Sequence, residues 1–457
     1  MVNLTFKSGL FPDALKCGIV SPIFKSCNPT DKGNYRPITV LIIISKLFER
    51  CIYNRFLDFF TKFSLISLHQ YGFQKGISTE TAIISLTEHI YNVINSKEIA
   101  VNIFIDFRKA FDTVQHDILI KKLEKYGIRG PALALMKSYL LSRTQKVKIS
   151  GYISSPKQIT IGIPQGTCLG PLLFLIYVNE LPKISDFTFP IIFADDTTLC
   201  MRGDNINDLV TRANFELEQF YDWATANRLT INTDKTFTMT VTNKRLPTTL
   251  PAVTINDITI PSQFSGKLLG FTIDNKLSFK LHITNICKKV AKSTGIIYKL
   301  QKYLPTSSLI SLYYTFVYPH LLYCNLAWGN SAETNLNQLF ILQKKVIRII
   351  NKTPYNSHTN HLFYNNQILK LADISKLNIG RYMYLNPSTD YNFNHDYNTR
   401  HRHNLVPRFQ RTTLTQRSLT YSAPTLWNSI PSDIKSSPDL STFKYNYKKF
   451  LIAAYRT

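Results

Sequence analysis

Cysteine is scarce in this chain, and its seven cysteines, at positions 17, 27, 51, 168, 200, 287 and 324, form no Cys-x-x-Cys pair. This spacing argues against a zinc knuckle and a secreted disulfide framework, and it favours reduced thiols in the cytosol or nucleus. Long apolar runs are also missing, because the longest, over 38–44 and 171–178, are far too short to span a bilayer. The amino terminus lacks the apolar stretch of a signal peptide. We therefore expect a nuclear or cytoplasmic protein with no signal peptide, transmembrane segment or membrane partner.

Acidic residues are in short supply, with 29 Asp and Glu against 54 Lys and Arg, which gives a formal net charge of +25. A surplus of this size predicts a polyanionic partner. The positive charge is spread along the chain, which favours nucleic acid over a membrane surface. Apolar residues make up 44% and aromatic residues 12% of the 457 residues, so we expect a folded protein with several subdomains. We find no internal repeat and no low-complexity linker.

Two adjacent aspartates, Asp195 and Asp196, stand between the hydrophobic run 190–193 and the β-prone run 197–200. This pattern predicts a strand, a tight turn and a second strand, with both carboxylates at or beside the turn. Adjacent ionised carboxylates repel each other, so a fold that holds them usually supplies a cation. Oxygen ligands suit a hard ion such as Mg²⁺. Taken alone, such a pair is more simply explained as an ordinary hairpin turn.

A third aspartate, Asp106, lies near the end of the apolar segment 101–107. The alternation of this segment places its odd-numbered residues on one face of a strand and Asp106 on the other. An aspartate that closes a buried strand, beside a hairpin with two more, is the arrangement that two-metal phosphoryl transfer requires. Spacing alone does not establish that these strands are neighbours.

The residues around these aspartates form ordered motifs. Asp-Phe-Arg-Lys-Ala-Phe-Asp (106–112), Gly-Ile-Pro-Gln-Gly-Thr-Cys-Leu-Gly-Pro (162–171) and Phe-Ala-Asp-Asp (193–196) follow one another. Four more motifs, at 34–38, 71–76, 227–236 and 267–271, complete the series, and the tail over 421–428 also takes part. Together they resemble the reverse transcriptase of non-LTR (LINE-type, jockey-like) retrotransposons over nearly the whole chain.

The resemblance implies an α+β fold of the right-hand polymerase type. Partial fingers would occupy residues 1–98, an antiparallel-sheet palm 99–265, a helical thumb 266–350 and a basic C-terminal extension 351–457. The implied activity is RNA-directed DNA polymerisation, in which dNTPs are added to a DNA primer on an RNA template. The implied cofactors are two Mg²⁺ ions, with Mn²⁺ as a substitute. Asp106, Asp195 and Asp196 would be catalytic metal ligands, with the carbonyl of Phe107 as a further ligand; protein partners are not predicted.

The resemblance also implies a set of substrate-binding residues: Lys25, Arg36, Phe111, Gln165, Gly166 and Lys235. Arg36 presents a planar fork that suits phosphate oxygens, whereas Lys25 is explained equally well as a surface cation. Phe111 would lie under the incoming sugar and exclude a 2′-hydroxyl, with a core role as the alternative. Gln165 would contact the nucleotide or template from a loop whose glycines permit close approach. Lys235 would assist the pyrophosphate leaving group.

Apolar residues at helical spacing predict helices over 44–60, 78–94, 117–126, 172–181, 207–227, 276–302, 307–323 and 336–350. The segment 276–302 carries seven lysines and no acidic residue. In the position of a thumb it would track a template–primer duplex, and we predict contacts from Lys288, Lys289 and Lys292. A solvated helix face is the alternative. The last hundred residues, including Arg400–His403, are basic and aromatic and suit RNA or target-DNA contact.

Two rival functions remain. A catalytically inactive nucleic-acid-binding remnant of such an element would keep the basic surface without polymerising. A viral RNA-dependent RNA polymerase is disfavoured because Phe111 would hinder ribonucleotides and because Phe-Ala-Asp-Asp is the reverse-transcriptase form. We find no ribonuclease H carboxylate set and no endonuclease region, and the fingers begin in their middle, so we expect a fragment or truncated copy.

Overall fold

The structure is a computed structural model that describes residues 1–25, 28–387 and 404–456. The predicted basic cluster Arg400–His403 lies outside the described residues. The α+β class predicted from the sequence is confirmed, because helices are interspersed with mainly antiparallel sheets through residue 274, and the named elements in the described residues after it are α-helices and a 3₁₀ turn. No helix in the described ranges combines the length and the apolar composition that crossing a membrane requires.

The central sheet has four antiparallel strands in the order β7 (Phe189–Phe193), β8 (Asp196–Gly203), β3 (Ile99–Ile105) and β9 (Phe237–Val241). Strand β3 is buried along its whole length. Its odd-numbered residues pack into one hydrophobic cluster, whereas Ala100 and Phe104 pack into another on the opposite face. The predicted alternation is therefore confirmed, and it shows that both faces of this sheet are covered.

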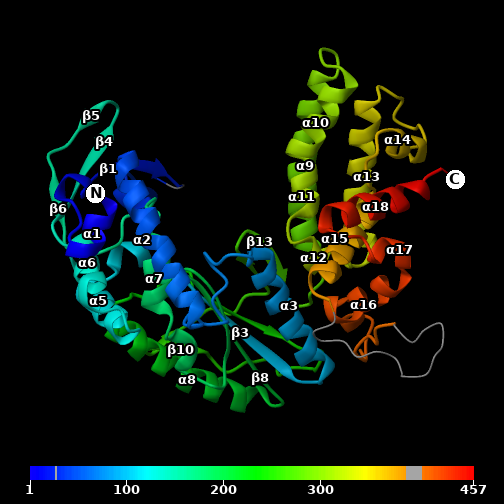
Figure 1. Cartoon of the computed structure of the whole chain (residues 1–457). Coiled ribbons are helices and arrows are strands. Elements are labelled where there is room, and N and C mark those ends of the chain that lie inside the picture. The colour runs from blue at the N-terminus through cyan, green and yellow to red at the C-terminus, as the bar shows by residue number, and fades with distance from the viewer. Residues whose placement is uncertain (26–27, 388–403, 457) are drawn as a thin grey trace.

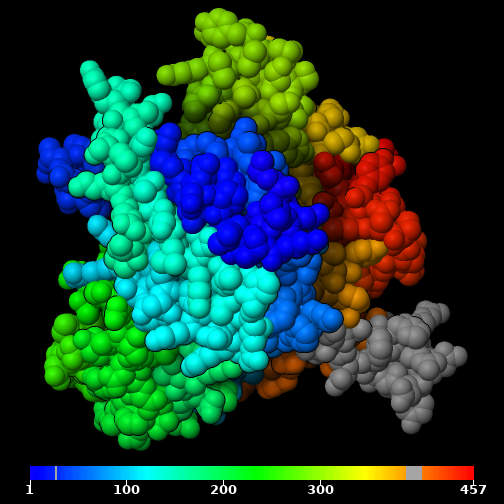
Figure 2. Space-filling model, turned by 60° about the vertical axis from the view of Figure 1, so that its left-hand side comes forward, coloured from blue at the N-terminus to red at the C-terminus, as the bar shows by residue number. Residues whose placement is uncertain are grey.

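Helices on both faces cover the central sheet (Figure 1). One face packs against α2 (Ile43–Lys62), α5 (His116–Lys125), α6 (Gly130–Leu140), α7 (Gly170–Val178) and α8 (Ile206–Ala226). The other packs against α3 (Thr79–Asn95), which begins at a capping box formed by Ser78 and Thr81. Short elements complete this part: α1 (Val2–Ser8), α4 (Ala110–Thr113) and the 3₁₀ turns Asp13–Leu15, Lys32–Asn34 and Leu181–Lys183. Figure 2 shows α1, in dark blue, against the cyan residues of α6.

The outer sheet is formed by β1 (Cys17–Phe24), β2 (Tyr35–Val40), β4 (Arg143–Ile149), β5 (Tyr152–Ile153) and β6 (Lys157–Ile159). Strand β1 pairs with β2 in antiparallel and with β4 in parallel orientation. The sheet is joined to the loop before α7, because the Thr39 amide donates to the Gln165 carbonyl oxygen at 2.7 Å. Two small hairpins, β10 (Thr254–Ile255) with β11 (Ile258–Thr259) and β12 (Ser265–Leu268) with β13 (Phe271–Asp274), lead to the helical region.

The helical region comprises α9 (Lys280–Leu300), α10 (Thr306–Phe316), α11 (Tyr318–Leu322), α12 (Asn325–Trp328), α13 (Glu333–Ile350), α14 (Asn360–Asn365), α15 (Leu371–Leu385), the 3₁₀ turn Thr415–Arg417, α16 (Leu419–Ser429), α17 (Ser432–Lys435) and α18 (Leu440–Ala453). The predicted helix over 307–323 is divided into α10 and α11, because Pro319 lacks an amide hydrogen and cannot continue the hydrogen-bond ladder.

Elements before and after residue 350 share one hydrophobic core. The Glu88 carboxylate on α3 accepts hydrogen bonds from the Leu419 and Thr420 amides, which fixes the start of α16 against α3.

Candidate active site

Asp106 directly follows strand β3 and is held by the turn at 232–236. The Asn232 side-chain amide donates to Asp106 Oδ2 at 2.8 Å, and the Asn232 backbone amide donates to the Asp106 carbonyl oxygen at 2.7 Å. The Asp106 amide donates to Thr236 Oγ1 at 3.4 Å. Lys235 Nζ lies 3.9 Å from Asp106 Oδ2 at the exposed edge of the turn. Three residues of this turn, Asn232, Lys235 and Thr236, therefore fix the position of Asp106.

The hairpin of β7 and β8 presents Asp195 and Asp196 at its turn, as predicted from the sequence. Ala194 adopts a left-handed conformation with φ of 59°, which makes the reversal tight. The buried side chain of Gln70 accepts hydrogen bonds from the amides of Ala194, at 3.2 Å, and Gly72, at 2.9 Å. The preceding strand is held as well, because the Tyr71 amide donates to the Ile192 carbonyl oxygen. The segment 69–72 thus holds the β7–β8 hairpin in place through hydrogen bonds to its backbone.

The three aspartates share one electrostatic environment. Burial raises the pKa of Asp195, the nearby Asp106 raises it further, and the cations of Arg36 and Lys25 oppose this rise. Burial, together with repulsion from Asp195 and Asp106, raises the pKa of Asp196 to about 6. Carboxylates that lose water and repel each other in this way are stabilised by a bound cation.

We tested whether these residues fit a divalent metal. All three side chains offer only oxygen atoms, which is the donor chemistry of Mg²⁺ and Mn²⁺. Repulsion between these carboxylates adds to the effect of burial on the pKa values of Asp195 and Asp196, and a cation would relieve this repulsion. Across the described parts of the chain, however, no three His, Cys, Asp or Glu side chains already converge in metal-binding geometry. The donor set therefore fits, and the side chains would have to close around an ion.

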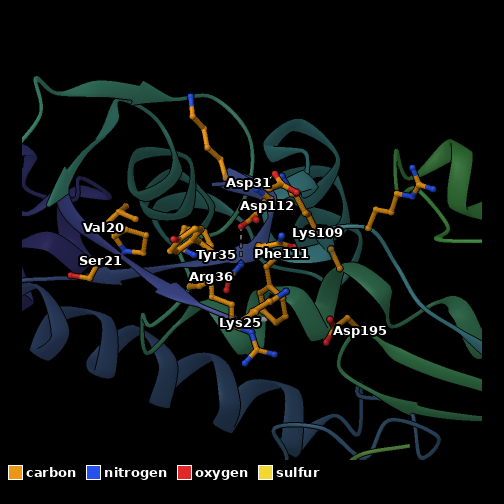
Figure 3. Close-up of a pocket in the computed structure, with 18 of the residues that line it drawn as sticks. Val20, Ser21, Lys25, Asp31, Tyr35, Arg36, Lys109, Phe111, Asp112 and Asp195 are labelled. Atoms are coloured by element: carbon orange, nitrogen blue, oxygen red, sulfur yellow. Dashed lines mark hydrogen bonds between the residues drawn. The ribbon is translucent and has the colours of Figure 1, made fainter. Parts of the chain in front are cut away.

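A cleft of about 1690 Å³ lies between the outer sheet and the aspartates. Its lining includes Lys25 and Arg36 from the outer-sheet side and Asp195 from the hairpin, as Figure 3 shows. The remaining predicted residues in its lining are Asp106, Phe107, Phe111, Gln165, Asp196 and Lys235. Every predicted catalytic, metal-binding and substrate-binding residue except Gly166 therefore lines one cleft.

Gly166 lies beneath strand β2 and outside this lining. Its φ is 98°, and an added Cβ would lie 2.9 Å from the Thr39 carbonyl oxygen. The glycine is therefore needed for the close approach of two backbones. Its neighbour Gln165 donates from Nε2 to Asp112 Oδ1 at 2.9 Å, which orients the glutamine at the edge of the cleft.

Phe111 lies at the floor of the cleft. Its ring stacks on that of the buried Phe174, with centroids 4.3 Å apart, and meets the edge of Phe73 at 6.4 Å. The ring therefore has a fixed position, and its remaining surface lines the cleft.

Comparison of the sequence with known proteins shows which family the chain belongs to. The family described as reverse transcriptase (RNA-dependent DNA polymerase) matches residues 25–273, which is more than half of the chain. The chain belongs to the reverse transcriptase family. The predicted resemblance to non-LTR elements is also confirmed by curated relatives from Drosophila melanogaster. The RNA-directed DNA polymerase from mobile element jockey is 32% identical over 81% of this chain and 41% of its own length. The probable polymerases from transposon BS and transposon X-element are 30% and 32% identical over 77% and 76% of this chain.

The chain spans about two fifths of the length of these relatives. Among solved structures, apo telomerase from Candida tropicalis has a TM-score of 0.44 at 11% identity, over 79% of this chain and 63% of that chain.

Three residues of this reverse transcriptase support the site without having been predicted. Asn232 lies inside the motif at 227–236, and Gln70 directly precedes the motif at 71–76. These positions indicated that both residues lie near the site, but they did not indicate what either side chain does there. Glu49 is fully buried in α2 and accepts hydrogen bonds from the Tyr139 hydroxyl at 2.7 Å and the Cys168 amide at 2.9 Å. Burial raises its pKa. Its contacts fix the loop that carries Gln165, and an acidic residue within an apolar helix face is the only sequence signal for it.

Lys288, Lys289 and Lys292 are exposed on α9, in the helical region, and none of them lines the cleft. Lys289 lies close enough to His282 and His320 to lower their pKa values, in addition to the larger effect of burial. The amphipathic character predicted for this helix is confirmed, because Ile283, Val290 and Ile297 are buried on its other face.

Proposed function

We propose that this reverse transcriptase copies RNA into DNA by adding dNTPs to a primer. The observation that carries the proposal is the joint placement of Asp106, Asp195 and Asp196 in a cleft lined by the cations of Lys25, Arg36 and Lys235. Carboxylates on one side and cations on the other match a triphosphate that reacts beside a divalent metal.

The three aspartates would hold two Mg²⁺ ions, or Mn²⁺ in their place, with the Phe107 carbonyl as a further ligand. Bound metal would lower the pKa of the primer hydroxyl and offset the charge of the departing pyrophosphate. Asn232 would keep the Asp106 carboxylate oriented for this role. Arg36 and Lys25 would bind the triphosphate or template, and Lys235 would neutralise pyrophosphate.

We assign the fingers to residues 1–98, the palm to 99–265, the thumb to 266–350 and a C-terminal extension to 351–457. The RNA template and DNA primer would be the macromolecular partners. In the parent element, DNA synthesis would take place in the nucleus or the cytoplasm.

The test is primer extension. Purified protein with a primed RNA template, dNTPs and Mg²⁺ should extend the primer. A folded chain that binds the template–primer but never extends it, with either Mg²⁺ or Mn²⁺, would rule out polymerisation. That result would leave the non-catalytic remnant, which nothing in the cleft favours at present.

The ring of Phe111 is expected to select the sugar. Phe111→Val should create space for a 2′-hydroxyl and raise the ratio of rNTP to dNTP kcat/KM by at least about tenfold. Phe111→Tyr keeps the bulk of the ring and serves as the matched control. An unchanged ratio in the valine variant would show that Phe111 only packs on Phe174.

The lysines of α9 are expected to bind the duplex backbone. Replacing Lys288, Lys289 and Lys292 by glutamine should weaken binding for all sequences alike and reduce the slope of log K against log salt by up to about three phosphate contacts. The control variant replaces three exposed lysines of α5 and α6 by glutamine, at Lys121, Lys125 and Lys137. Equal slopes in the two variants would show that the α9 lysines face bulk solvent.

A further inference from the structure

A second hollow, of about 710 Å³, lies between the C-terminal ends of α9 and α13, two helices that pack side by side (Figure 1). It shares no lining residue with the active-site cleft. Helix α9 has 21 residues and is about 30 Å long, so its end stands well away from its start beside β13. We call this hollow the tip site.

The charged side chains described in the lining of the tip site are all cationic. Lys345 and Arg348 follow Ile341 at intervals of four and three residues, which places them along one stripe of α13. Lys352 lies just after the end of this helix and lines the same hollow. Lys302 faces them from the end of α9. Among the described residues that line the hollow, four are cationic and none is acidic. Such a surface attracts an anion that can span several cations.

Two exposed tyrosine rings flank these cations. Tyr298 is 58% exposed on the last turn of α9, and Tyr355 is 90% exposed on the loop that follows α13. Tyrosine combines an apolar ring with a polar hydroxyl and is enriched at surfaces that contact other molecules. Two such rings beside a cationic hollow therefore offer exposed faces on which a planar group can stack.

The loop that carries Tyr355 has a defined shape. The Arg348 side chain donates from Nε to the Ser357 carbonyl oxygen at 2.8 Å, which closes the loop against α13. The Ser357 amide donates to the Pro354 carbonyl oxygen at 3.1 Å, and Lys352 adopts a left-handed conformation with φ of 53°. Tyr355 is thus placed by its backbone although its side chain has little packing.

We propose that the tip site binds an unpaired strand of nucleic acid, with phosphates at Lys302, Lys345 and Lys352 and bases stacked on Tyr298 and Tyr355. Alternating cations and aromatic rings are what an unpaired strand requires, because its bases expose π faces that a duplex keeps stacked. This inference goes beyond the proposed polymerisation. It concerns binding alone, so it is tested without catalysis.

The test uses fluorescent rU12 and dT12 oligonucleotides, with the active-site cleft saturated by a blunt RNA–DNA hairpin. The double variant Lys345→Ala, Tyr355→Ala should weaken oligonucleotide binding by at least about fivefold and reduce the salt slope by about 0.7. The double variant Lys444→Ala, Tyr445→Ala is the matched control. It removes one exposed lysine and one exposed tyrosine from α18, and it should bind as the parent does.

A second measurement locates the contact. Oligonucleotides that carry 4-thiouridine or 4-thiothymidine should crosslink to peptides that contain Tyr298 or Tyr355 while the hairpin is present. A stronger result with rU12 than with dT12 would identify RNA as the ligand, and the reverse would identify DNA. The proposal is overturned if the tip and control variants lose affinity equally, or if crosslinks form only within residues 106–235. It is also overturned if the tip variant loses polyglutamate binding as strongly as oligonucleotide binding, because charge alone would then explain the site. Failure of primer extension would leave this test unaffected.

Discussion

Asp195→Asn is expected to reduce primer extension by at least about a thousandfold while the protein stays folded. Asparagine has the size of aspartate but lacks the negative charge that holds a metal ion. The hairpin should keep its shape, because the Gln70 hydrogen bond is made to the backbone of Ala194 and not to the Asp195 side chain. Template–primer affinity, measured separately, should change little.

A matched control lies just after the far end of strand β8, which follows Asp195. Asp204 is exposed and pairs with Lys244 at 3.1 Å, away from the cleft. Asp204→Asn removes the same charge and should extend primers as the parent does. If both variants lose activity equally, the loss would come from the net charge or from the hairpin and not from a catalytic carboxylate.

Thermal stability in EDTA gives a second readout of the same substitution. Burial and the nearby Asp106 raise the pKa of Asp195 in the folded state, so its ionised form costs stability at neutral pH. That cost fades as the pH falls through the raised pKa, because the folded state takes up the proton more readily than the unfolded state. The Tm of Asp195→Asn should therefore equal or slightly exceed that of the parent at pH 7.5, and the difference should shrink towards pH 4. A lower Tm at pH 7.5 would show that the carboxylate stabilises the fold without metal.

Gly72→Ala is expected to reduce kcat by at least about tenfold and to lower stability by about 1–3 kcal/mol. An added Cβ would lie 2.6 Å from the Ala194 amide nitrogen and 3.1 Å from the Phe193 carbonyl carbon. Both atoms belong to backbone that cannot rotate away, so the turn that carries Asp195 must shift. A displacement of this kind moves a metal ligand without changing its chemistry.

Gly203→Ala is the control for this substitution. It lies at the other end of β8, and its Cβ would meet Leu209 at 3.4 Å, which is ordinary contact. Its kcat should match that of the parent. If Gly72→Ala retains full kcat, the close approach of the 69–72 segment to the hairpin would have no role in positioning Asp195.

Short-range patterns in the sequence predicted many of the helices, strands and turns of this protein. The alternation along β3, the turn at Asp195 and the periodicity of α2, α3, α8 and α9 were readable because each depends on residues close together in the chain. The split of the predicted helix over 307–323 had a local cause as well, in Pro319. The ordered motifs identified the family because they fix residue types at chemically demanding positions.

The tertiary structure alone decided which side chains meet. Asn232 reaches Asp106 across 126 residues, and Gln70 reaches Ala194 across 124. Glu88 reaches Leu419 across 331. No periodicity encodes such pairs, since they arise from the packing of separate elements. Gly166 illustrates the difference: its motif suggested a ligand contact, whereas the fold places it under β2.

The sequence by itself thus determined the carboxylates, the cations and the elements that carry them. Only the tertiary structure decided that Lys25 and Arg36 face the aspartates across one cleft, and that Tyr298 and Tyr355 flank a second, basic hollow. The physical reason is that residue type and local spacing fix what each element can bury or expose. The direction in which a polar side chain points depends on neighbours that lie far away in the chain.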